Sequence, residues 1–141
     1  MNEITALYDS YIRTVEELER TKKPTAGLLG ITKGPKDDPF HDRFADDLAE
    51  KLKMFSAKDP SSGEVRSLLE YMYEIPFQYR ENHMIYWMFT AVHSLVLDND
   101  LISRLNRADA QKIYEQYSKD YPRWERLPAQ KRTLKALKAM M

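Results

Sequence analysis

The residues of this chain best suited to chemistry are its three histidines, and the first of them lies within a run of acidic residues. His41 and Asp42 follow Asp38 by three and four residues, so a first helical turn would bring their side chains close to that of Asp38. Carboxylate oxygens with one imidazole form a donor set for Mg²⁺, Mn²⁺ or Zn²⁺. Acidic residues in a first turn also stabilise a helix through its dipole, without any metal. The cluster is therefore a metal-site candidate with a purely structural alternative.

The other two histidines belong to a polar stripe on one predicted helix. The stripe comprises His83, Tyr86, Trp87, Thr90 and His93. Imidazole, hydroxyl and indole groups on an otherwise apolar helix can line a small-molecule pocket, or they can form its one solvated face. The two histidines do not have the i, i+4 spacing of the H-E-x-x-H zinc motif. No nucleophile–base pair follows from spacing alone, so the sequence favours a protein that is not an enzyme and leaves the question open.

A segment rich in glycine and proline, residues 24–38, separates the first two predicted helices. Such long connections in compact domains are usually functional or disordered. Lysines near the glycines could cradle phosphate, but the glycine spacing does not match the P-loop pattern. The apolar side chains of the segment either pack on the core or dock on a partner, and docking is the interpretation we favour. The partner-binding candidates are Leu28, Leu29, Ile31, Lys33 and Phe40.

Apolar residues recur at intervals of three and four along the rest of the chain, which predicts helices. The predicted helices span residues 2–22, 39–55, 62–75, 81–97, 107–120 and 128–139. Prolines are expected only at helix edges, because a proline inside a helix removes a hydrogen bond. Ser61 to Glu64 has the pattern of a capping box, and Asn106 is a predicted N-cap. The sequence does not decide whether the fourth helix stops near Asp98 or continues to Leu105.

These elements predict an all-α fold in which residues 1–141 form a single-domain bundle of five to seven helices. The long Gly/Pro-rich loop lies between helices one and two, and residues 122–141 form a basic C-terminal segment. No period holds along the chain, which argues against a helical-repeat array. The helix over residues 81–97 is apolar nearly all round, so we expect it at the centre of the bundle.

The composition restricts the classes of function. The chain has no cysteine, which excludes disulfides and thiolate chemistry. Its 22 basic and 22 acidic residues balance, which argues against nucleic acid as a general partner. The longest apolar stretch, Met84 to Leu97, is too short for a membrane span. The first residues lack the features of a secretory signal, so we expect a cytoplasmic protein.

The charge is unevenly distributed despite the balanced total. Residues 37–64 carry eight acids and four bases, whereas residues 122–141 carry six bases and one acid. The two regions could attract each other across the fold or serve separate partners. The nine tyrosines of the chain favour protein–protein contact, because tyrosine is enriched in interfaces.

The sequence thus favours a cytoplasmic helical adaptor or regulatory module with an unidentified protein partner. We expect no cofactor and no membrane span, and self-association into a homo-oligomer remains open. The alternative is a small-molecule- or metal-binding helical protein, enzymatic or not. It would use His41 with its neighbouring aspartates, or the stripe from His83 to His93.

Overall fold

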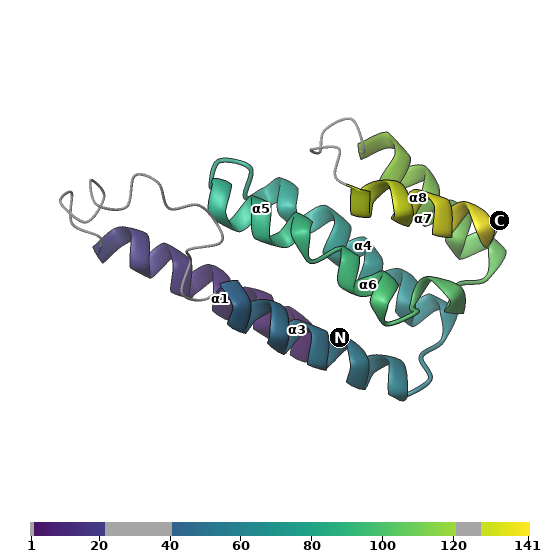
Figure 1. Cartoon of the computed structure of the whole chain (residues 1–141), viewed down its shortest axis with the longest axis horizontal. Coiled ribbons are helices and arrows are strands. Elements are labelled where there is room, and N and C mark those ends of the chain that lie inside the picture. The colour runs from purple at the N-terminus through teal and green to yellow at the C-terminus, as the bar shows by residue number, and fades with distance from the viewer. Residues whose placement is uncertain (1, 22–40, 121–127) are drawn as a thin grey trace.

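The computed structural model describes residues 2–21, 41–120 and 128–141, and every regular element in these ranges is a helix (Figure 1). The elements are α1 (Asn2–Thr21), α3 (His41–Ala57), α4 (Ser62–Gln78), α5 (His83–Ala91), α6 (Ser94–Asp98), the 3₁₀ helix η2 (Ile102–Arg104), α7 (Arg107–Asp120) and α8 (Pro128–Ala139). The all-α prediction is confirmed. No helix in the described part of the chain is long and apolar enough to cross a bilayer.

The helices stack as three antiparallel pairs in chain order (Figure 1). The first pair is α1 with α3, the middle pair is α4 with α5 and α6, and the last pair is α7 with α8. Within the stack, α4 contacts α7, while α6 contacts both α3 and α8. The helices α3, α6 and α8 run in one direction and form one row, and α1, α4 and α7 run in the other (Figure 1). The stack repeats a helical hairpin although the sequence carries no fixed period.

Aromatic side chains join the first pair to the middle pair. Tyr8 of α1 packs against Phe44 of α3 and Phe89 of α5, with ring centroids 5.2 and 4.6 Å apart. Its ring also meets Tyr71 of α4 edge-on at 5.3 Å. Two residues further along α4, Tyr73 packs on the ring of Tyr117 in α7 at 4.6 Å. Because side chains two apart on a helix point to nearly opposite sides, α4 bridges the two outer pairs.

The capping predictions are confirmed at two helix starts. The Ser61 hydroxyl accepts a hydrogen bond from the Glu64 amide, and the Glu64 carboxylate accepts one from the Ser61 amide, both at 3.2 Å. At the start of α7, the Asn106 side chain accepts from the Asp109 amide at 2.8 Å. These bonds satisfy amides that have no partner within their own helix.

The starts of α4 and α7 also share a cap that the sequence did not predict. The Ser62 hydroxyl accepts from the Asn106 amide at 2.8 Å and donates to the Asp109 carboxylate at 2.6 Å. The Arg66 guanidinium donates to the other oxygen of Asp109 at 2.7 Å. The Ser62 hydrogen bond, followed by the bond and charge of Arg66, holds the pKa of Asp109 below its ordinary value. The network fixes α7 to α4 at one end of the stack.

The expectation that every proline lies at a helix edge is wrong for Pro76, which lies inside α4. A proline has no N–H, so the carbonyl four residues earlier, that of Met72, loses its helical donor. The ring nitrogen Nε2 of His93 lies 2.9 Å from that oxygen. Since the carbonyl can only accept, Nε2 carries the proton and donates it. The Met72 carbonyl therefore keeps a hydrogen bond despite Pro76, supplied by a residue outside α4.

His93 reaches this position because the predicted helix over residues 81–97 is interrupted. Between α5 and α6 the amide of His93 bonds to Thr90 and that of Val96 to His93, each three residues apart. This tighter winding is typical of a 3₁₀ turn. The chain then ends α6 with Asp100 in a left-handed conformation, φ 53°, so helix four does not continue to Leu105.

Candidate functional site

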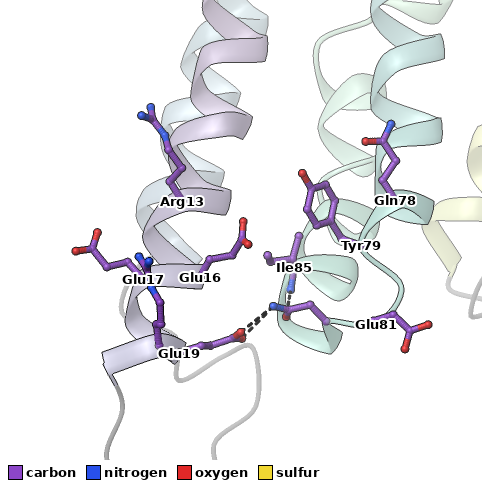
Figure 2. A pocket seen from close by; sticks show the side chains of 10 residues that line it. Arg13, Glu16, Glu17, Glu19, Gln78, Tyr79, Glu81 and Ile85 are labelled. Atoms are coloured by element: carbon purple, nitrogen blue, oxygen red, sulfur yellow. Dashed lines mark hydrogen bonds between the residues drawn. The ribbon is translucent and has the colours of Figure 1, made fainter.

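A cleft of about 770 Å³ opens between the C-terminal half of α1 and the turn that joins α4 to α5 (Figure 2). Its lining is mostly charged or polar. The lining residues are Arg13, Glu16, Glu17, Glu19, Arg20, Gln78, Tyr79, Glu81, Asn82 and Ile85. In Figure 2, Glu16 and Glu19 point across the gap toward the facing helices, whereas Glu17 and Glu81 point outward. The inner walls therefore carry carboxylates on one side and a phenol on the other.

Asn82 fixes the width of the cleft at its end. Its side-chain oxygen caps α5 by accepting from the Ile85 amide at 3.2 Å. Its side-chain nitrogen lies 3.0 Å from both carboxylate oxygens of Glu19 on α1. One amide thus holds the last turns of α1 against the start of α5, since each of its ends serves a different helix. The described lining residues include four glutamates and two arginines and are therefore net negative.

Tyr79 supplies the aromatic wall of the cleft. Its ring meets Phe89 edge-on, with centroids 6.1 Å apart, so the aromatic core supports it from behind. Partial burial, followed by the negative charges of Glu16 and Asp9, raises the pKa of Tyr79. The same causes, burial first and then Asp9, raise the pKa of the neighbouring Tyr71 to about 12. Both phenols therefore stay protonated near neutral pH, and Tyr79, which lines the cleft, can offer a hydroxyl donor there.

This arrangement can hold a cation. Carboxylates bind ammonium and guanidinium groups through charge-assisted hydrogen bonds, and a tyrosine face adds a cation–π contact. Among the described lining residues there is no histidine, serine or threonine, and the hydroxyl group that they offer is the phenol of Tyr79. The carboxylates and the tyrosine face fit recognition of a basic group.

The residues predicted to bind a partner lie outside the described ranges. These are Leu28, Leu29, Ile31, Lys33 and Phe40. Their role stays a prediction. In sequence they lie between Thr21, the last residue of α1, and His41, the first residue of α3. The last turns of α1 form one wall of the cleft.

The metal prediction is also only partly covered by the described residues. Asp38 lies outside them, whereas His41 and Asp42 begin α3, with Asp42 exposed. Within residues 2–21, 41–120 and 128–141, no three His, Asp or Glu side chains are grouped so that they could hold a metal ion. The set Asp38, His41 and Asp42 remains a prediction.

The structure separates the members of the polar stripe. His83 is exposed, Tyr86 and Trp87 are half-buried, and Thr90 and His93 are buried. The Thr90 hydroxyl donates to the Tyr86 carbonyl at 2.9 Å, a bond within the helix. His93 lies in the core against Tyr73, with centroids 4.8 Å apart. None of the five residues lines the cleft, so the stripe and the cleft are different features.

Sequence reasoning missed the cleft because its two walls are far apart along the chain. Glu19 and Asn82 are separated by 63 residues, and nothing in their local sequence indicates that they meet. The charged residues of α1 have the pattern of an ordinary solvated face. One local signal was present: Asn82 precedes an apolar helix, which is typical of an N-cap.

Comparison of the chain with protein-family models, with curated proteins and with solved structures found no match.

Proposed function

We propose that the protein is a cytoplasmic adaptor or regulatory module that binds a basic segment of another protein in the cleft between α1 and the α4–α5 turn. The observation that supports this function most is the open, net negative cleft with Tyr79 on its wall. Small-molecule pockets are mostly apolar and enclose their ligands, whereas the lining here is largely charged. A charged rim is typical of a surface that meets a protein partner.

The proposed contacts follow from the chemistry of the walls. A lysine or arginine of the partner would meet the carboxylates of Glu16 and Glu19 and lie against the ring of Tyr79. The apolar anchors would come from the adjoining segment, in which Leu28 and Leu29 are the candidates. A binding site with a charged half and an apolar half agrees with the usual division between polar rim and apolar centre in interfaces.

Affinity capture from native lysate with charge-reversed variants tests this proposal. The cleft variant is Glu16→Lys/Glu81→Lys, with one glutamate from each side of the cleft. The matched control is Glu74→Lys/Asp98→Lys, which reverses two exposed acids of α4 and α6 away from it. We expect a protein that the wild type and control retain and the cleft variant loses, followed by at least a tenfold weaker affinity in calorimetry with the purified partner. All three should melt within a few degrees of one another, because exposed substitutions change stability little.

The predicted apolar anchors have their own variant, Leu28→Ser/Leu29→Ser. It should lose the same partner without a loss of thermal stability. A large drop in melting temperature would instead make these leucines part of the core. Retention of every captured protein by the cleft variant would contradict the proposal. That result would favour the alternative function, binding of a small molecule or metal at His41 or at the stripe from His83 to His93.

A further inference from the structure

The two outer helix pairs of the stack carry opposite charge. α1 and α3 together have nine acidic and five basic residues, a net charge of −4. α7 and α8 together have three acidic and seven basic residues, a net charge of +4. The middle pair lies between them (Figure 1), so the two charges are held on opposite outer layers. The sequence left two possibilities, that the acidic and basic regions attract each other within one molecule or that they contact separate partners. Their separation by the middle pair favours separate partners.

The positive charge is concentrated on α8. Four basic residues and no acidic residue occupy this helix. Lys131, Arg132, Lys135 and Lys138 are all exposed, on the side away from the buried Thr133 and Leu137. Within the described part of the chain none of the four forms an ion pair, although ion pairs are present on α3 and α4. Like charges one turn apart repel, so an external anionic surface would stabilise this row.

An acidic row of similar length lies on α3. Asp42, Asp46 and Glu50 are exposed and four residues apart, on the side away from the buried Phe44 and Leu48. The row spans about 12 Å, and that from Lys131 to Lys138 spans about 10 Å, at 1.5 Å per residue.

Each charged row ends at an exposed methionine. Met54 follows the acidic row and is 42% exposed, and Met141 follows the basic row and is 36% exposed. These are the exposed large apolar side chains of the described residues. Two parallel rows of matched length would therefore bring three opposite charges together and, at the same end, two methionines.

The stack itself sets the direction of such a contact. Within one molecule α3, α6 and α8 are neighbours in one row and run in the same direction (Figure 1). The next place in that row, beyond α8, would be filled by α3 of a second copy in the same parallel direction. In the other row, α1 of the second copy would then follow α7. The parallel register that matches the charges is thus the one that continues the stack.

We propose that the protein associates head to tail with a second copy of itself, the basic face of α8 binding the acidic face of α3. This contact joins two different surfaces, so each bound copy leaves one further surface of each kind open and longer chains of copies can form. The inference goes beyond the proposed cleft function, and none of its residues lines the cleft.

Sedimentation velocity of the full chain at several concentrations tests the proposal, using two complementary charge reversals. The first variant is Lys135→Glu/Lys138→Glu on α8, and the second is Asp46→Lys/Glu50→Lys on α3, so that the exchanged charges face each other in the parallel register. Each alone opposes like charges and should remain monomeric. Mixed together, they restore opposite charges at both surfaces and should associate again. The control Glu74→Lys/Asp98→Lys, on the middle pair, should associate like the wild type.

Salt provides the second measurement, because exposed ion pairs are screened as the Debye length shortens from about 10 Å at 0.1 M to about 3 Å at 1 M. We expect wild-type association at low salt that weakens by at least tenfold at high salt. A wild type that is monomeric at every concentration and salt, or a mixture that stays monomeric, would overturn the proposal. Monomeric protein that binds duplex DNA or phosphatidylserine vesicles through Lys135 and Lys138 would also overturn it and assign the α8 face to a polyanion.

Discussion

His93 is neutral in the folded protein because its ring is fully buried between the middle and last helix pairs. Tyr73 and Tyr117 lie against it, with centroids 4.8 and 6.2 Å away, and Nε2 donates to the Met72 carbonyl. Burial lowers the pKa of His93 to about 4, and the Met72 hydrogen bond opposes only part of that shift. The imidazole is therefore a structural donor, and a proton placed on its other nitrogen would carry charge into an aromatic core.

This burial predicts a loss of stability in mild acid. Between pH 7 and about 4, the unfolded chain takes up a proton on His93 near its ordinary pKa, whereas the folded protein does not. The unfolded state then binds more protons, so the free energy of unfolding decreases as the pH falls and levels off below about 4. His93→Gln, whose amide can also donate to Met72, should reduce the loss between pH 7.5 and 4.5 by about 2–3 kcal/mol. Urea unfolding at both pH values measures it.

The exposed His83 provides the control for that measurement. His83→Gln shows how far the same substitution on the surface alters the measurement. If the His93→Gln variant and the wild type lose equal stability in acid, the lowered pKa of His93 is contradicted.

At the scale of the elements, two helices complete each other where one of them contains a proline. Pro76 removes the donor for Met72, and the short 3₁₀ turn between α5 and α6 places His93 over that carbonyl. A buried carbonyl without a donor costs about 1–3 kcal/mol. Together the two irregularities leave the Met72 carbonyl with a hydrogen-bond donor.

A double-mutant cycle tests this coupling. His93→Leu in the wild type should destabilise the fold by about 1–3 kcal/mol beyond its packing change, because the Met72 carbonyl is left without a donor. Pro76→Ala restores a backbone amide at position 76 that can bond to Met72, so in that background His93→Leu should cost at least about 1 kcal/mol less. Urea unfolding of the four proteins gives the coupling free energy. The same cost for His93→Leu in both backgrounds would contradict the coupling.

The shared cap between α4 and α7 carries a separate prediction. Ser62→Ala removes both the acceptor for the Asn106 amide and the donor to Asp109, so it should lower the free energy of unfolding by about 1–2 kcal/mol. Ser67→Ala on the exposed side of α4 is the matched control and should change it by less than about 0.5 kcal/mol. Chemical denaturation of both variants measures these two changes. Equal midpoints for the two variants would mean that the shared cap contributes nothing to stability.

At the scale of the whole molecule, stability should be graded from the middle of the stack outward. α4 contacts α5, α7 and η2, and its two sides hold Tyr71 and Tyr73 against opposite neighbours. α8 belongs to the last pair, and its described buried residues are few: Gln130, Thr133 and Leu137. Opening of α8 therefore exposes less apolar surface than opening of α4.

Native-state hydrogen exchange should reveal this gradient. We expect the slowest amides in α4, exchanging only with global unfolding, and faster exchange throughout α8 through a partial opening. Mass spectrometry of peptides from the two helices, at one pH and temperature, provides the comparison. Protection in α8 equal to that in α4 would instead mean that the last pair unfolds only with the whole.

Local sequence signals were sufficient for much of the fold. The spacing of apolar residues identified the helices, and Ser61 and Asn106 marked two of their starts, because caps depend on residues a few positions apart. Pro76 defeated the same reasoning, since the donor that permits it comes from a residue 17 positions later. The cleft was missed for a similar reason: the contact between Glu19 and Asn82 depends on how the pairs stack.

Because the hydrogen bond from His93 replaces the one that Pro76 cannot donate to the Met72 carbonyl, positions 76 and 93 should change together in evolution. A lineage that replaces the proline regains an amide and frees the histidine to change, whereas a lineage that keeps the proline needs a donor at position 93. A proline in α4 and a histidine 17 residues later, after α5, would then be retained longer than most of the surrounding sequence. Such a pair offers a marker for distant relatives whose overall similarity has decayed.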